Sequence, residues 1–205
     1  MAPTLLIGSC ESFSGKSAVV LGLARQLSRL GVPVRFGKPL ATSLDAPGAQ
    51  SSSSALLDAD VRFIGATLGL PESHLIPSLH VLDAATAQQR LLQGNLEPGA
   101  GFPLLRQQLE AAPDGVTLLE AAGSLHEGLL YGLSLGQLAQ ELHAPVLLVH
   151  PWTDSCSIDP LLAAQAQLGD NLAGVVLNAV NPDLVPQLCT ELLPALEGLG
   201  LPVLG

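Results

Sequence analysis

The feature that most constrains the fold of this chain is a set of short runs in which nearly every residue is apolar. The runs lack a strict apolar–polar alternation, so both faces of each expected strand should be buried. Each is separated from the next by longer segments with helical patterning. The expected strands are residues 3–8, 32–36, 116–120, 146–150, 172–178 and 201–204. This order predicts an α/β fold of three layers, with a mostly parallel sheet flanked by helices.

The expected helices are bounded by residues that commonly stop or start a helix. Gly31 follows the first of them, and Ser134 can cap a later one. Residues 70–82 contain two prolines and should be irregular, and the serine-rich residues 46–54 should be flexible. The expected helices are residues 16–30, 55–68, 84–93, 102–111, 134–142, 160–168 and 182–196.

The first expected strand enters a glycine- and serine-rich loop that ends in Gly15-Lys16-Ser17 and opens a helix. In such a loop the backbone N–H groups and the helix N-terminus bind phosphate oxygens. A lysine at this position reaches the β- and γ-phosphates, and the following hydroxyl binds Mg²⁺. The spacing is imperfect, because Cys10 stands five residues before Gly15. The order of elements still predicts ATP binding, with Lys16 catalytic and Ser17 on the metal. The expected nucleotide-binding residues of the loop are Ser12, Phe13, Ser14, Gly15, Lys16 and Ser17.

A carboxylate is needed beside the metal, and Glu120 ends an apolar strand where parallel-sheet sites lie. We predict that Glu120 binds Mg²⁺ directly or through water. Asp58 and Asp60 begin the second expected helix, so one should cap it while the other faces the metal. Asp60 is the candidate metal-side residue, although spacing leaves Asp58 open. Asn178 also ends a strand, and its amide can either contact adenine or hold a turn.

Lysine is rare in this chain, which has six arginines but only Lys16 and Lys38. Lysine is a compact point charge, whereas arginine is a planar fork, so selective use of lysine favours a tight site. Lys38 follows Gly37 after an expected strand, as Lys16 follows Gly15. We therefore expect Lys38 on the γ-phosphate or acyl side of the site. Because two ammonium groups repel, its replacement should leave the melting temperature of the protein without nucleotide unchanged or slightly raised.

Composition excludes several classes of function. The chain of 205 residues is 48% hydrophobic and carries a net charge of −10, so it is neither disordered nor suited to nucleic-acid binding. No apolar run is long enough for a membrane span, and the N-terminus lacks a basic leader. Three cysteines at no metal spacing suit a reducing, cytoplasmic setting. Among them, Cys10 is expected to be a small loop residue.

These motifs resemble, in order and over essentially the whole chain, the dethiobiotin synthetase-like branch of P-loop NTPases, which includes the cobyrinic acid diamide synthetases. The resemblance rests on Gly15-Lys16-Ser17, Gly37-Lys38-Pro39-x-x-Thr42, Leu119-Glu120-Ala-Ala-Gly123 and Gly174-Val-Val-Leu-Asn178. Residues 14–23 and 157–164 are most similar to the N-terminal domain of some phosphotransacetylases and its stand-alone relatives. The resemblance implies that Thr42 contacts the second substrate, that Lys38 faces the transferred phosphate and acyl group, and that Asn178 touches adenine.

Two departures from the family limit what the resemblance implies. The loop reads Ser12-Phe13-Ser14 where the family has a glutamate, and it is one residue longer. Residues 154–160 replace the Asn-His stretch with which dethiobiotin synthetases grip their substrate across a dimer. The resemblance therefore implies the nucleotide site without the substrate of the biotin pathway.

Two functions stay open from the sequence. The first is a magnesium-dependent ATP-binding domain that acts as a slow ATPase or nucleotide sensor. The alternative is an ATP-dependent ligase that activates a small carboxylate, carbamate or acyl substrate, as dethiobiotin synthetase does. A partitioning ATPase is disfavoured because no lysine stands between Gly8 and Gly15. We expect one P-loop domain over residues 1–205, a chain end that looks truncated before a downstream domain, and a possible homodimer through the helices after Glu120.

Overall fold

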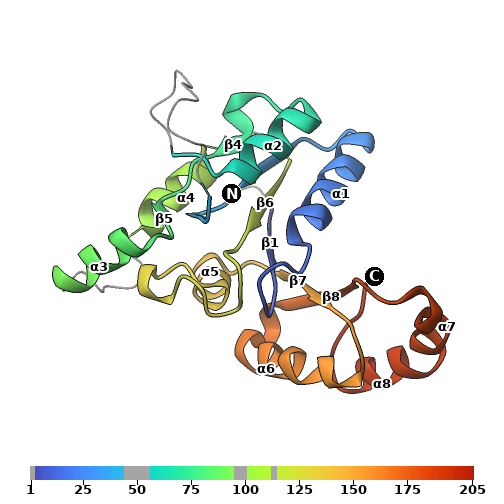
Figure 1. Cartoon of the computed structure of the whole chain (residues 1–205). Helices are drawn as coiled ribbons and strands as arrows, with labels where there is room; N and C mark the ends of the chain where they lie inside the picture. The colour runs from blue at the N-terminus through green and yellow to red at the C-terminus, as the bar shows by residue number, and fades with distance from the viewer. Residues whose placement is uncertain (1–2, 44–55, 95–100, 112–114) are drawn as a thin grey trace.

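The computed structural model describes residues 3–43, 56–94, 101–111 and 115–205, and its centre is a parallel sheet (Figure 1). The strand order is β4-β2-β6-β1-β7-β8, and every neighbouring pair is parallel. The strands are β1 (Thr4–Gly8), β2 (Val34–Gly37), β4 (Leu75–Ile76), β6 (Val116–Glu120), β7 (Val146–Pro151) and β8 (Leu172–Asn178). The expected α/β class with a parallel sheet is confirmed.

Helices cover both faces of this sheet. They are α1 (Lys16–Arg29), α2 (Ala59–Leu68), α3 (Ala84–Leu92), α4 (Phe102–Glu110), α5 (Leu135–Leu142), α6 (Ile158–Leu168), α7 (Val185–Gln187) and α8 (Leu193–Gly198). Among the described residues, no helix combines the length and the apolar character needed to cross a membrane.

Two hydrophobic cores explain why the strands are apolar throughout. Neighbouring residues on one strand face opposite cores: Leu6 of β1 packs with residues of α4, α5 and α6, whereas Ile7 packs with residues of α1 and α2. Leu119 and Leu118 of β6 divide between the cores in the same way. A strand buried on both faces cannot keep a polar side, so the sequence pattern follows from the layers.

The pairing of β1 with β6 brings two distant segments to one edge of the sheet. Ile7 lies opposite Glu120 in the register, so the loop after β1 and the loop after β6 leave the sheet side by side. Gly8 lies against Leu135 of α5, where an added Cβ would come within 2.2 Å of that side chain. Only a residue without a side chain fits at position 8, where β1 ends and the loop begins.

The segment between α1 and α3 differs most from expectation. Residues 70–82 are not wholly irregular, because they contain a 3₁₀ turn (Glu72–His74), β4 and β5 (His80–Val81). β5 pairs with β3 (Leu40–Ala41), which was not expected, and forms a second, two-stranded parallel sheet. Two-residue strands carry no periodicity, so only tertiary pairing reveals them. The second helix begins at Ala59 instead of residue 55, and residues 46–54 lie outside the described part.

The last expected helix, residues 182–196, is not continuous. It divides into a 3₁₀ turn (Pro182–Leu184), α7, a wider π-helical turn (Leu188–Leu192) and α8. Pro186 and Pro194 lack the N–H that a regular helix requires, which explains the interruption. The expected final strand is shorter: Val203 bridges Val175 of β8, and the Leu177 N–H donates to the Gly205 carbonyl at 2.8 Å.

Candidate functional site

A cavity of about 620 Å³ opens at the carboxyl ends of β1, β2 and β6. It brings together side chains that are far apart in the sequence, including every expected site residue except Asn178. Its lining residues are Ser12, Phe13, Ser14, Gly15, Lys16, Ser17, Lys38, Thr42, Ser43, Asp60, Leu82, Glu120, Gly123 and Glu127.

The glycine-lysine-serine segment forms the junction between the loop and α1. Gly15 adopts a left-handed conformation (φ +91°) directly before the helix begins at Lys16. The first turn of α1 contains no acidic residue, which leaves the positive end of the helix dipole uncompensated. The free N–H groups of this helix end and the adjacent loop form a suitable cradle for an anion.

Lys16 is buried, with 7% of its surface exposed, and its ammonium faces the loop that follows β6. The Nζ donates to the Gly123 carbonyl at 2.8 Å and to the Ser9 hydroxyl at 2.9 Å. Burial lowers the pKa of Lys16, the nearby charge of Lys38 lowers it further, and Glu120 opposes both. Ser9 was missed in the sequence because it carries no motif of its own, yet it orients the lysine.

Asn178 does not line the cavity but supports the loop from behind. Its Nδ2 donates to the Ser14 carbonyl at 2.8 Å. An added Cβ at Gly15 would come within 2.2 Å of that same amide nitrogen, so the glycine and the asparagine fit only together. The structure thus gives Asn178 a contact with the loop backbone. The adenine contact implied by the resemblance stays a prediction.

Phe13 stands at the tip of the loop with its side chain fully exposed and its backbone at φ +61°. Such a φ is unusual for a bulky side chain. Because the ring points into solvent, only the backbone of Phe13 is placed to meet a phosphate from within the cradle.

Glu120 is buried at the floor of the cavity, with 2% of its surface exposed. Its Oε1 accepts a hydrogen bond from the Ser17 hydroxyl at 3.3 Å, and its Oε2 has no hydrogen-bond partner. Burial raises the pKa of Glu120 to about 7, although the charges of Lys38 and Lys16 pull it downward. A buried carboxylate oxygen without a partner is costly unless a ligand or cation completes the site.

Lys38 is held within a cluster of carboxylates. Its Nζ lies 3.0 Å from Asp60, 3.5 Å from Asp58 and 3.9 Å from Glu120, and it donates to the Thr42 hydroxyl at 2.6 Å. Burial favours the neutral amine, but the three negative charges outweigh that effect and raise the pKa of Lys38. The ammonium is therefore paired within the protein, whereas the sequence argument considered only its repulsion from Lys16.

The structure also separates the two aspartates that spacing left open. Asp58 is fully buried, caps α2 through the Asp60 N–H, and accepts from the backbone N–H groups of Thr42 and Ser43 at 2.8 and 3.1 Å. Asp60 lines the cavity and is 41% exposed. Since backbone donors engage both oxygens of Asp58, Asp60 is the aspartate with room for a ligand.

Three cavity residues were not singled out in the sequence: Ser43, Leu82 and Glu127. Leu82 follows β5, whose existence depends on tertiary pairing. Glu127 had a recognisable signal, since it is the only acidic residue in the glycine-bearing segment 121–132 after β6.

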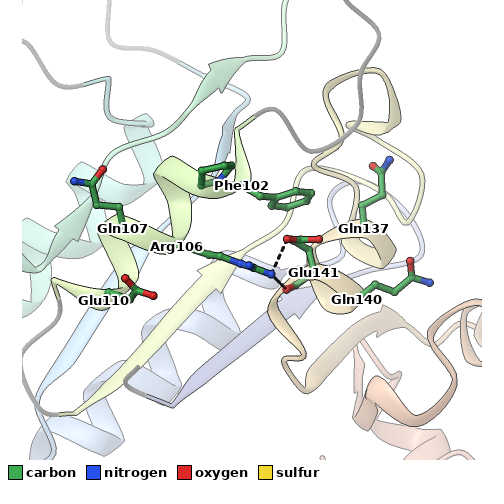
Figure 2. Close-up of a pocket in the computed structure, with 8 residues that line it drawn as sticks. Phe102, Arg106, Gln107, Glu110, Gln137, Gln140 and Glu141 are labelled. Atoms are coloured by element: carbon green, nitrogen blue, oxygen red, sulfur yellow. Dashed lines mark hydrogen bonds and ion pairs between the residues drawn. The ribbon is translucent and has the colours of Figure 1, made fainter.

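Two other features carry no comparable chemistry. Burial raises the pKa of Cys10 to about 12, so its thiol stays protonated, as expected for a small loop residue. A second hollow lies between α4 and α5, away from the strand ends (Figure 2). Its arginine, Arg106, is already paired with Glu141 at 2.7 Å, as the dashed lines in Figure 2 show.

The Lys38 cluster predicts an effect on stability opposite to that expected from the sequence. Replacing Lys38 by Met keeps most of the apolar stem but leaves Asp58 and Glu120 buried without their cation. We expect the free energy of unfolding to fall by about 3 kcal/mol. Chemical denaturation of the protein without nucleotide measures this change.

Arg106→Ala is the control, because it breaks an ion pair whose partners are 45% and 36% exposed. Exposed pairs contribute at most about 1 kcal/mol, so this variant should change stability little. A Lys38→Met protein as stable as the natural chain would support the expectation derived from the sequence.

Comparisons with known proteins agree with this geometry. The AAA_26 family, described as an AAA domain, matches residues 3–205. The chain is 30% identical over 207 residues to the ATP-dependent dethiobiotin synthetase BioD of Pseudomonas aeruginosa strain LESB58, covering 99% of this chain and 88% of that protein. It is 28% identical over 211 residues to the hydrogenobyrinate a,c-diamide synthase of Agrobacterium fabrum, of which it spans only 40%.

A solved structure shows the same fold at low identity. Chloroplast FtsY from Physcomitrella patens superposes with a TM-score of 0.57 at 17% identity, covering 99% of this chain and 57% of that one. The likeness in fold supports a P-loop NTPase architecture. With the family match over almost the whole chain, it shows that the protein belongs to the AAA_26 family, in the dethiobiotin synthetase-like branch of the P-loop NTPases.

Proposed function

We propose that this protein is an ATP-dependent ligase of the dethiobiotin synthetase type, which binds Mg–ATP and activates a small carboxylate or carbamate. The observation that carries the proposal is the position of Lys38 and Thr42 in the same cavity as the phosphate loop. A nucleotide-binding domain needs only the loop, whereas a transferase also needs a second set of polar groups that face the transferred phosphate.

The phosphate half of the site consists of the loop, the N-terminus of α1 and Lys16. The backbone N–H groups from Ser12 to Ser17 would donate to the β- and γ-phosphates. Lys16 would exchange its bonds to Ser9 and Gly123 for phosphate oxygens, which offer a stronger charge-assisted bond. Lys16 already lines the cavity that the phosphates would enter.

Magnesium fits the oxygen donors beside the loop. Ser17 and Glu120 already contact each other, the free Oε2 of Glu120 can accept a cation, and Asp60 lines the same cavity. Among the described residues, no group of three or more His, Cys, Asp or Glu side chains could hold a metal by itself. This suits Mg²⁺, which keeps water and phosphate ligands and takes few from protein. When bound, Mg²⁺ would neutralise part of the negative charge of the phosphates.

The transfer half consists of Lys38, Thr42 and the free oxygen of Asp60. A substrate carboxylate oxygen would attack the γ-phosphorus, the bond from that phosphorus to the bridging oxygen would break, and ADP would leave. Lys38 would stabilise the charge that develops on the transferred group, and Thr42 would donate to the substrate. The acyl phosphate would then react with a nucleophile and release phosphate.

The two functions left open by the sequence share nucleotide binding and differ in the second substrate. The relatives favour the ligase, since one is named an ATP-dependent dethiobiotin synthetase and another a hydrogenobyrinate a,c-diamide synthase. The slow ATPase or nucleotide sensor is the result expected if no substrate stimulates phosphate release.

The first test concerns nucleotide and turnover together. Calorimetry should show magnesium-dependent ATP binding that Lys16→Ala abolishes without loss of the folded state, because Lys16 is the lysine that follows the loop and bonds beside it to Ser9 and Gly123. Phosphate release should rise with one member of a panel of aliphatic carboxylates, or of amines with bicarbonate. Lys38→Ala should keep ATP binding but lose this stimulation.

The outcomes separate the alternatives. ATP binding with phosphate release that no panel member changes would favour the ATPase or sensor. Equal ATP affinity in the natural chain and Lys16→Ala would refute the proposed phosphate site itself.

Asn178 provides a second test, because its visible contact is with the loop and not with a base. Asn178→Ala should weaken binding of inorganic tripolyphosphate several-fold, since the Ser14 carbonyl loses its donor and the loop loses support. An adenine contact would appear as an additional loss seen only with ATP. Unchanged tripolyphosphate affinity, measured by calorimetry, would contradict the supporting role.

The raised pKa of Glu120 provides a third test. Below pH 7 the protonated carboxyl binds a cation poorly, and above pH 7 the carboxylate binds it well, so ATP affinity with magnesium should rise several-fold from pH 6 to pH 8. Glu120→Gln should weaken binding and remove most of this rise. The same steep pH dependence in Glu120→Gln would assign the titration to another group.

A further inference from the structure

Glu127 is a cavity residue to which neither motif nor proposed function assigns a role. It lies in the loop after β6, seven residues beyond Glu120, and its side chain lines the cavity together with the phosphate loop. Within the part of the chain that the structure describes, its carboxylate takes part in no hydrogen bond or ion pair. This carboxylate is therefore free to interact with a ligand that enters the cavity.

The contacts around Gly123 place this carboxylate beside the phosphate-binding lysine. A Cβ added at Gly123 would come within 2.3 Å of Glu127 Oε2 and within 2.6 Å of the Ser12 hydroxyl. Lys16 donates to the carbonyl of the same glycine at 2.8 Å. Glu127 therefore approaches the phosphate loop across Gly123, and its charge is close enough to raise the pKa of Lys16.

The other charges of the cavity do not neutralise Glu127. Lys38 already has three carboxylates within 4 Å, namely Asp58, Asp60 and Glu120. Lys16 is the other ammonium in the lining, and its bonds go to Ser9 and Gly123. When Glu120 is ionised, the two lysines of the lining face three acids, Asp60, Glu120 and Glu127, so a bare triphosphate would enter a cavity that is already negative.

We propose that Glu127 is a specificity-determining residue that makes nucleotide binding depend on a divalent cation, by repelling triphosphate that carries no metal. The inference rests on the proposed function only in assuming that the nucleotide occupies the phosphate loop. A metal-bound triphosphate brings two compensating charges into the cavity, whereas a metal-free triphosphate meets the unpaired carboxylate beside Lys16. Near a protein surface such repulsion is stronger than in bulk water.

The test compares ATP affinity with magnesium and with EDTA for the natural chain and Glu127→Gln, by calorimetry at pH 8, where Glu120 is mostly ionised. Removing the charge should tighten metal-free ATP binding by about tenfold. Binding with magnesium should change much less, about twofold. The ratio of the two dissociation constants therefore falls several-fold in the variant.

Two control variants isolate the position of the charge. Glu127→Asp keeps the carboxylate and should keep most of the dependence on metal. Glu11→Gln removes the same charge from an exposed residue of the phosphate loop that does not line the cavity, and it should leave the ratio unchanged. Thermal melting of each variant confirms that it is folded.

The outcomes distinguish failure of this inference from failure of the proposed function. An unchanged ratio in Glu127→Gln, or an equal fall in Glu11→Gln, would overturn it while leaving the proposed function intact. A natural chain that binds ATP under neither condition would overturn both. A fall confined to Glu127→Gln would support the assignment.

Discussion

The site depends on one pairing, that of β1 with β6 at the centre of the sheet. Because the strands are parallel, both deliver their following loops to the same edge, and the register places Glu120 opposite Ile7. The hydroxyl of Ser17, at the start of α1, can then reach a carboxylate more than a hundred residues away, and Lys16 can bond to the Gly123 carbonyl. Without this pairing the loop would be an anion cradle with no acidic partner for a metal.

The two lysines occupy opposite electrostatic environments within one cavity. Burial lowers the pKa of Lys16, which bonds to neutral oxygens and is free to exchange them for phosphate. The surrounding carboxylates raise the pKa of Lys38, which is fixed as a cation before any ligand arrives. This difference suits a division of roles, with one lysine binding the nucleotide and the other holding charge at the point of transfer. Glu127, unpaired beside Lys16, adds a repulsive element that favours the metal-bound nucleotide.

Most of the architecture and much of the site could be predicted from the sequence, for identifiable reasons. Strands buried on both faces leave continuous apolar runs. Gly15-Lys16-Ser17 between a strand and a helix is typical of a phosphate-binding loop. Other features left no local signal. β3 and β5 are two residues each, and Ser9 looks like any loop serine. The stability argument for Lys38 counted only the repulsion from Lys16, because the carboxylates that the tertiary structure brings around Lys38 leave no local signal in the sequence.

By itself, the sequence determined the fold class, the phosphate loop and the strand that carries Glu120. Each of these depends on contiguous residues, so its pattern can be recognised in the sequence alone. Only the tertiary structure decided which aspartate caps α2 and which faces the cavity, since Asp58 is engaged by the backbone of Thr42 and Ser43. It also decided that Asn178 supports the loop and that Glu127 enters the cavity. Apart from the local cap bond between Asp58 and Asp60, these contacts join segments at least 15 residues apart, and their balance of charge and hydrogen bonds exists only after the sheet has assembled.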